Sequence, residues 1–310
     1  MYKAVLGAIC CLSFALSLHA QSPQEKGLQS IRAVVAAIRC LSFPLSLQAQ
    51  SPQEKGLQSI SRTSAEAIVG FLADDELQGR EAGMHGSRLA ARYLASCLKE
   101  AGIAPLEKDN YYQPFEAYNK ERQQRGRWQV HPDSIAILKQ GVHRILQMSN
   151  VLGTIPGERP DEYGIVGAHF DHLGVDETLA NDRIYNGADD NASGVSAVLQ
   201  IARAFLATGQ KPLRTVIFAF WDGEEKGLLG SKYFVQSWPF ISQVKGYLNF
   251  DMIGRNNKPE QPQHVVYFST AAHPVFGDWL KQDIARYSLR LHPDYRAWDR
   301  PSSPTPPHCP

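Results

Sequence analysis

Apolar residues between positions 150 and 290 follow two alternating patterns. Short, nearly continuous apolar runs, typical of strands buried on both faces, occupy residues 151–155, 164–168, 214–221, 246–250 and 264–269. Longer segments with an apolar residue every three or four positions, typical of helices, occupy residues 192–207, 228–236 and 274–286. Strands that alternate with helices predict an α/β fold with a mostly parallel central sheet covered on both faces.

The segment before position 150 has a different pattern. Residues 63–76 and 86–102 have helical periodicity, and Cys97 lies on the apolar face of the second helix, which favours a core position over a ligand. Residues 111–147 are β-like and charged, and the polar run 119–127 predicts a hairpin or loop.

The amino-terminal residues predict a secretory leader. Lys3 precedes an apolar run of roughly 15 residues, which ends in small and polar residues around Ala20. A membrane-spanning helix needs about 20 apolar residues, so this run is short for one. We interpret residues 1–20 as a signal peptide and expect a secreted or periplasmic protein with no stable membrane insertion. A buried first helix is the alternative.

Part of this leader is repeated. Residues 11–31 recur as residues 40–60, with differences only at Ala15/Pro44 and His19/Gln48. Two copies are fewer than a solenoid needs, so a duplicated leader is the better interpretation. We therefore expect residues 21–60 to be disordered or cleaved, and to have no role in the chemistry. The cleaved bond would follow Ala20 or Ala49.

Composition excludes some partners. The 310 residues have a net charge of +1, with 43% apolar and 20% charged residues. These values are ordinary for a globular protein and give no reason to expect a nucleic acid or an anionic membrane as a partner. Three of the five cysteines, Cys10, Cys11 and Cys40, lie in the leader copies, so no disulfide framework is expected.

Four segments carry histidine or acidic residues, most of them after a predicted strand. They are Ala-His-Phe-Asp-His-Leu-Gly at 168–174, Asn-Gly-Ala-Asp-Asp-Asn-Ala-Ser-Gly at 186–194, Asp-Gly-Glu-Glu-Lys-Gly at 222–227 and Asn-Phe-Asp-Met at 249–252. The carboxyl ends of parallel strands meet at one edge of a sheet. Imidazoles and carboxylates are zinc ligands, and a further glutamate can act as a base in metal-assisted hydrolysis. The pattern predicts a metal site.

These segments resemble the co-catalytic zinc aminopeptidases of the bacterial leucyl aminopeptidase and aminopeptidase Y type, a family that includes glutamate carboxypeptidases and glutaminyl cyclases. The similarity begins at Phe-Leu-Ala-Asp-Asp-Glu-Leu-Gln-Gly-Arg-Glu, residues 71–81, and continues to about residue 287. It implies a three-layer, zinc-exopeptidase-like catalytic domain over residues 61–298. It also implies two Zn²⁺ ions in a complete site.

The resemblance implies a set of metal ligands. His169 would bind one zinc, with Asp171 holding its other ring nitrogen, and Asp251 would complete that position. Asp189 would bridge both ions and would be followed by a cis peptide bond to Asp190. The remaining ligand implied is Glu225, on the second zinc.

Glu224 is implied to be the general base and acid. Two adjacent glutamates after a strand point to different faces, so one can bind metal while the other faces the attacking water. His172 is interpreted as a neighbouring structural residue, and Ser193 as part of a helix cap.

The chain departs from the family pattern after Asp251. The family has a late histidine as a further ligand, and none of the later histidines, His264, His273, His292 and His308, has the expected surroundings. Residues 299–310 form a proline-rich tail that can supply neither a strand nor a helix. We therefore expect an incomplete catalytic domain, with the zinc of Asp189 and Glu225 weakly held.

The leading hypothesis is an extracytoplasmic aminopeptidase that hydrolyses the amino-terminal residues of peptides by a metal-activated water, with Glu224 as general base. Three alternatives stay open. A glutaminyl cyclase would use one zinc, but the intact 222–230 motif favours hydrolysis. A carboxypeptidase would need basic side chains that grip a terminal carboxylate, and the sequence identifies none. A truncated, non-catalytic domain would bind metal without turnover.

Overall fold

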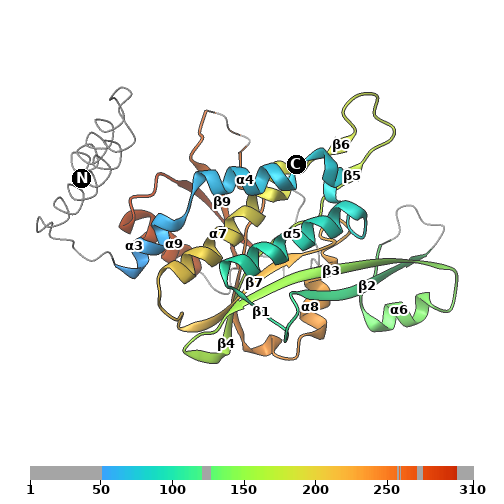
Figure 1. Ribbon diagram of the computed structural model, residues 1–310, viewed down its shortest axis with the longest axis horizontal. Helices are drawn as coiled ribbons and strands as arrows, with labels where there is room; N and C mark the ends of the chain where they lie inside the picture. Colours follow the sequence, from blue (N-terminus) through green and yellow to red (C-terminus); the bar gives the residue numbers. More distant parts are fainter. Residues whose placement is uncertain (1–50, 121–126, 257, 259, 271–274, 299–310) are drawn as a thin grey trace, which may run out of the picture. The chain divides into compact units, whose positions relative to one another are not determined.

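The computed structural model describes residues 51–120, 127–256, 258, 260–270 and 275–298 (Figure 1). The leader and most of its repeat, including Ala20 and Ala49, lie outside the described residues, as do His273, His308 and the proline-rich tail. Ser51 is the first residue of the folded unit.

The central sheet has six strands in the order β1-β3-β7-β4-β8, with β2 also paired to β3. The strands are β1 Ala104–Pro105, β2 Tyr112–Lys120, β3 His143–Ile155, β4 Arg159–His169, β7 Arg214–Trp221 and β8 Val244–Asn249. Strands β7, β4 and β8 are parallel, whereas β1 and β2 pair antiparallel with β3, and β3 pairs antiparallel with β7. The expected α/β class is therefore confirmed, with a mixed sheet in place of a mostly parallel one.

The direction of β3 follows from its connection to β4. Only residues 156–158 separate the two strands. A parallel pair needs a crossover of a dozen or more residues, so such a short connection reverses the chain. Apolar periodicity identified the end of β3 at residues 151–155, but it carries no information on strand direction.

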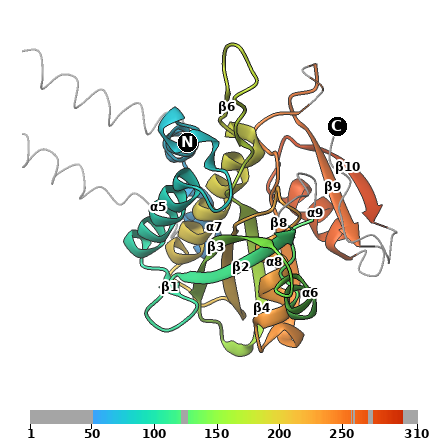
Figure 2. The ribbon, with the colours of Figure 1, turned by 90° about the vertical axis from the view of Figure 1, so that its right-hand side faces the viewer.

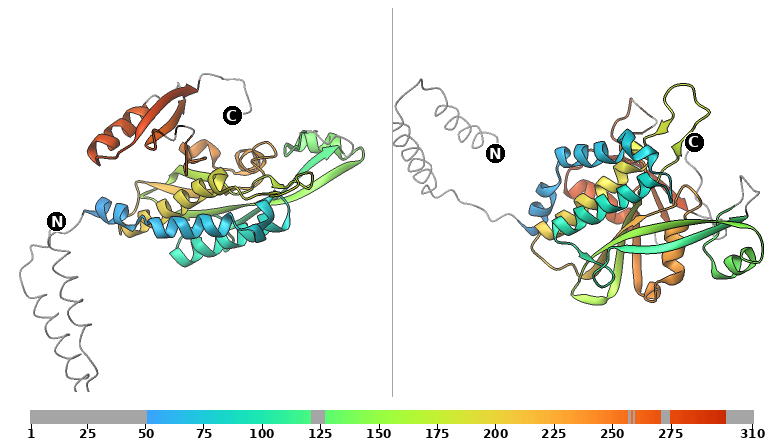
Figure 3. Two further views of the ribbon diagram at one scale, coloured as in Figure 1. Left: turned by 90° about the horizontal axis from the view of Figure 1, so that it is seen from above. Right: turned by 45° about the vertical axis from the view of Figure 1, so that its right-hand side comes forward.

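The two faces of the sheet form separate apolar cores, and β7 contributes to both. Val216, Phe218 and Phe220 face one core, while Ile217, Ala219 and Trp221 face the other, as the two-residue period of a strand requires. Helices α4 Arg62–Leu72, α5 His85–Ala101 and α7 Gly194–Ala207 cover the first face, with α5 and α7 side by side (Figures 1 and 3). Helix α8 Leu229–Ser237 covers the second face with Phe234, together with Trp238, which caps the end of the helix.

Helix α3, Pro52–Ser59, lies within the segment assigned above to the duplicated leader. Ser51 and Glu54 form a reciprocal capping box at its start. Gly56 is buried, and a Cβ built there would lie 3.1 Å from the carbonyl oxygen of Ala204 in α7. Thus Ser51–Ile60 belongs structurally to the folded unit, because a capped helix packs its glycine face against α7.

The segment 111–147, expected to be β-like, contains β2, the first part of β3 and one helix that the sequence did not predict. Strands β2 and β3 run side by side as a long antiparallel ribbon (Figure 2). Helix α6, Pro132–Leu138, begins with His131 as N-cap and Pro132 at its first position. The predicted hairpin falls largely on residues outside the described ranges, but Tyr118 and Gln129 exchange two backbone hydrogen bonds at its base.

The last described elements form a βαβ unit. Strand β9 His264–Thr270 and strand β10 His292–Trp298 pair in parallel, with helix α9 Val275–Arg286 between them in the chain. The shorter elements are β5 Gly174–Val175, β6 Ile184–Tyr185 and the helical turns η1 Asp75–Arg80, η2 Ala188–Ser193 and η3 Ile241–Gln243. Within the described ranges, none of the helices has the length and apolarity to cross a bilayer.

Candidate metal centre

The four segments singled out in the sequence meet where the parallel strands end. His169 is the last residue of β4, the 222–225 turn follows β7, and Asp251 follows β8. Turn η2 enters this edge just before α7 and supplies Asp190. Because β4, β7 and β8 are parallel, the fold brings these side chains together at one sheet edge.

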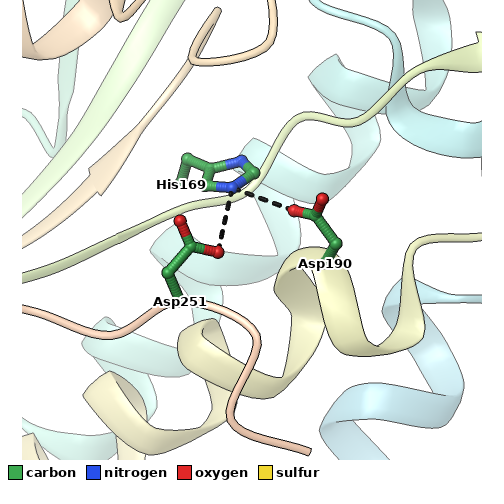
Figure 4. Close-up of side chains that lie close together, drawn as sticks. All are labelled: His169, Asp190 and Asp251. Atoms are coloured by element: carbon green, nitrogen blue, oxygen red, sulfur yellow. Dashed lines mark ion pairs between the residues drawn. The ribbon is translucent and has the colours of Figure 1, made fainter. Parts of the chain in front are cut away.

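A first group of ligand-type atoms surrounds His169 (Figure 4). Its Nε2 atom lies 3.1 Å from Asp190 Oδ1 and 3.7 Å from Asp251 Oδ1. Zinc bonds of about 2.0–2.2 Å at tetrahedral angles set neighbouring ligand atoms roughly 3.3–3.6 Å apart. The spacing and the chemistry of these three donors therefore fit a zinc ion.

A second group shares Asp190 with the first. It contains His172, Asp190 and Glu225, whose ligand-type atoms lie within 4.8 Å of one another. His172 Nδ1 is 2.8 Å from Glu225 Oε1 and 4.0 Å from Asp190 Oδ1. The structure thus brings together His169, Glu225 and Asp251 of the expected residues, and adds His172, which the sequence had suggested as a structural neighbour.

Asp189 lies outside both groups, although the sequence pointed to it as the bridging ligand. Its Oδ1 atom accepts hydrogen bonds from the backbone N–H groups of Gly254 at 2.7 Å and Arg255 at 3.2 Å. Its Oδ2 atom lies 3.5 Å from Arg255 Nε. The cis peptide bond follows Asp190, not Asp189. Two adjacent aspartates give no sequence signal that separates them, so Asp190 replaces Asp189 as the candidate ligand.

The backbone of η2 explains why Asp190, and not Asp189, faces the imidazoles. Asp190 departs from helical geometry, with φ −101° and ψ 98°, and Asn191 follows at φ −132° and ψ 39°. Gly187, at φ +62°, begins the turn in the left-handed region, and a Cβ there would collide with the carbonyl of Asp190. The kink turns the Asp190 carboxylate toward the imidazoles and that of Asp189 toward the 254–255 backbone.

Asp171 is fully buried and connects the two sides of the centre. Its Oδ1 and Oδ2 atoms accept the backbone N–H groups of Glu224 at 3.0 Å and Glu225 at 3.3 Å. Its carboxylate is 3.6 Å from His169 Nδ1, and its own carbonyl oxygen is closer to that nitrogen, at 3.1 Å. Asp171 therefore orients both the histidine and the turn that carries the glutamates.

The surroundings of Glu224 favour the protonated form of its carboxyl group. Burial raises its pKa to about 7, and the charges of Asp171, Glu225 and Asp251 act in the same direction, against the opposing effect of His169. A carboxyl group with a pKa near neutrality can both accept and return a proton.

Imidazole and carboxylate groups of the centre shift one another's pKa values. Burial disfavours the charged form of His169, but hydrogen bonds to Asp171, Asp190 and Asp251 outweigh it and raise its pKa well above 6.5. Burial also opposes ionisation of Asp190, but its pKa is lowered by His169, His172 and Arg80. A cation that enters the centre would therefore displace a proton from His169.

Arg80 is a buried cation that sequence reasoning did not single out, although it lies in the 71–81 segment. Its side chain is fully buried, and burial lowers its pKa to about 10. Among the described residues, its guanidinium donates hydrogen bonds to four backbone carbonyls, those of Leu72, Phe170, Asn186 and Gly187. It thereby ties together three segments around the centre, and its charge acts on Asp171, Asp190 and Glu225.

Two of the late histidines lie in described parts of the chain. His264 opens β9 and is buried, and His292 opens β10 with Nε2 3.1 Å from Gln263 Oε1. In the described ranges, neither belongs to the two groups of ligand-type side chains.

Comparison with known proteins finds similarity to one peptidase family. Residues 150–303 match peptidase family M28. Leupeptin-inactivating enzyme 1 of Streptomyces exfoliatus is 38% identical over 120 residues, which cover 38% of this chain and 24% of that protein. An aminopeptidase of Pseudomonas aeruginosa is 31% identical over 133 residues, which cover 42% of this chain and 23% of that protein. Other matched relatives are named as probable zinc metalloproteases.

The solved structures agree on the fold. The LapA aminopeptidase of Legionella pneumophila superposes with a TM-score of 0.53 at 20% identity, covering 77% of this chain and 56% of that chain. The matched segments span about a quarter of the two curated relatives above. The resemblance inferred from the sequence motifs and the α/β architecture are both confirmed.

Proposed function

We propose that this chain, whose residues 150–303 match peptidase family M28, is a zinc-dependent aminopeptidase acting on the amino-terminal residues of peptides. The observation that carries the proposal is the convergence of two imidazoles and three carboxylates, with Asp190 shared, beside the raised-pKa carboxyl of Glu224. Perturbed acids beside a ligand cluster are typical of metal-assisted hydrolysis.

The donor set suits two zinc ions. His169, Asp190 and Asp251 would hold one ion, while Asp190 and Glu225 would hold the other. When bound, zinc lowers the pKa of a water toward about 7 and polarises a carbonyl group. Calcium and magnesium prefer all-oxygen ligand sets, so the imidazoles favour zinc.

The chain's own residues then supply the proton transfers. Glu224 accepts a proton from the attacking water and returns it to the leaving amine, and its pKa near 7 suits both steps. Asp171 fixes the position of Glu224 by accepting its backbone N–H at 3.0 Å. The backbone carbonyl of Asp171, 3.1 Å from His169 Nδ1, keeps the ring of His169 oriented.

Hydrolysis and substrate direction are tested together. The purified chain, supplied with zinc, is incubated with a peptide that has a free amino terminus, with its N-acetylated form and with a peptide that begins with glutamine. We expect release of the first residue from unblocked peptides alone. Release from the carboxyl end, or a pyroglutamate product, would replace the aminopeptidase assignment by one of the two related activities.

A matched pair of variants separates chemistry from metal binding. Glu224→Gln should retain zinc and lose activity by about 10²–10⁴-fold, because a general base is removed. Glu225→Gln should lose zinc first. If Glu224→Gln keeps full activity, Glu224 is not the base.

We also propose that the protein is exported, on the basis of the leader-like residues 1–20. Cleavage after Ala49 would leave Ser51 in place as the N-cap of α3. Amino-terminal sequencing of protein recovered outside the cytoplasm should begin at Gln21 or Gln50. A mature chain that retains Met1 would contradict this proposal.

A further inference from the structure

His172 lies at the boundary of the metal centre, and its ring is held in place. The residue is 8% exposed, and its backbone N–H donates to the carbonyl of Arg80 at 3.1 Å. A parallel bridge pairs it with Glu81, and its ring meets that of Tyr185 edge-on at 6.4 Å. A buried imidazole with a fixed backbone is oriented before any ligand arrives.

We propose that His172 is a direct zinc ligand, which forms the second metal position together with Glu225 and Asp190. This inference rests on the proposed function, because it assigns one more residue to the same two-zinc centre. Each position would then hold one imidazole and one carboxylate of its own, with Asp190 between them.

The distances support coordination by His172 Nδ1. This atom lies 2.8 Å from Glu225 Oε1 and 4.0 Å from Asp190 Oδ1. Zinc requires about 3.3–3.6 Å between ligand atoms. The distance from Nδ1 to Glu225 would therefore lengthen, and the distance to Asp190 would shorten, each by about half an ångström. Such shifts need only small side-chain rotations. Nδ1, which faces Glu225, is thus the ring nitrogen that would bind the ion.

The competing explanation is that His172 only orients Glu225 by a hydrogen bond. Replacements of His172 can distinguish zinc binding from hydrogen bonding to Glu225. A glutamine can still donate a hydrogen bond to Glu225, but its amide is a poor zinc ligand. An alanine removes both the hydrogen bond and the ligand. Loss of an orienting partner typically lowers metal affinity by about 10–100-fold.

The experiment measures metal binding to the full chain, with no reference to turnover. Wild type, His172→Gln, His172→Ala and His292→Ala are loaded with zinc, dialysed and analysed by metal mass spectrometry. Affinity for each equivalent follows from chelator competition, and Co²⁺ titration reports each site by its visible absorption. Circular dichroism confirms that the variants are folded. His292→Ala is the matched control, since His292 pairs with Gln263 and lies in neither group.

We expect wild type and His292→Ala to bind two ions. Both His172 variants should keep the first ion, held by His169 and Asp251, and should bind the second more than 100-fold more weakly. Added imidazole should restore the second Co²⁺ absorption band in His172→Ala. If His172→Gln retains the second ion within tenfold of wild type, or if wild type binds a single ion that the His172 variants leave unchanged, the ligand assignment is overturned. If wild type binds no zinc, the proposed function itself fails.

Discussion

The choice between Asp189 and Asp190 gives the most discriminating test of the centre. Asp190→Asn and Asp189→Asn change neighbouring residues by the same isosteric replacement, so each is the control for the other. Asp190 Oδ1 lies 3.1 Å from His169 Nε2 and 4.0 Å from His172 Nδ1, and its carboxylate belongs to both groups. Asp189 instead accepts the backbone N–H groups of Gly254 and Arg255.

The two variants should affect different properties, zinc affinity for Asp190→Asn and folding stability for Asp189→Asn. Asp190→Asn replaces a shared anionic ligand, so zinc affinity should fall by more than the roughly 100-fold that loss of an orienting partner can cost, or about 2.7 kcal/mol. Asp189→Asn keeps an acceptor oxygen but weakens two charge-assisted hydrogen bonds, at about 1 kcal/mol each. Its ion pair with Arg255, which is 82% exposed, adds little. The second variant should therefore lose about 1–3 kcal/mol of stability and keep its zinc.

Two measurements on each variant complete the test. Chelator competition gives the zinc affinity, and urea unfolding of the metal-free protein gives the stability. The reasoning is refuted if Asp189→Asn loses zinc while Asp190→Asn retains it, since that result would restore Asp189 as the bridging ligand.

Three further predictions concern the acid, the buried cation and the metal. Burial raises the pKa of Glu224 to about 7, and bound cations would lower it. The rate of peptide hydrolysis should therefore rise with pH as Glu224 ionises at or below about pH 7. A pH–rate profile without this ionisation would contradict the role of Glu224 as base. Arg80→Met leaves four backbone carbonyls without their donor, so the free energy of unfolding, measured by urea denaturation, should fall by about 3–5 kcal/mol. The control Arg88→Met loses one exposed hydrogen bond to Gly83 and should change that free energy by less than about 0.5 kcal/mol. Removal of zinc with a chelator should lower the Tm, and zinc in excess should restore it; a Tm insensitive to zinc would argue against a folded-state metal site.

The apolar pattern predicted most of the sheet and helices because it depends on local periodicity. Strand β7 was predicted with its observed bounds, Arg214–Trp221, and α5 was predicted within one residue at each end. Helix α6 was missed because it is short and has no buried residues, so it leaves no apolar stripe. The antiparallel direction of β3 was missed because side-chain alternation is the same in both strand directions.

The sequence by itself determined that His169, the 222–225 turn and Asp251 would gather at one edge, because each follows a strand and parallel strands end together. Only the tertiary structure decided which of two adjacent aspartates faces the imidazoles, because that direction depends on the kinked backbone of η2. It also decided the place of His172 beside Glu225 and of Arg80 among four carbonyls. Except for the contact of Arg80 with Leu72, these contacts join residues that are far apart in the chain, and no local period encodes them.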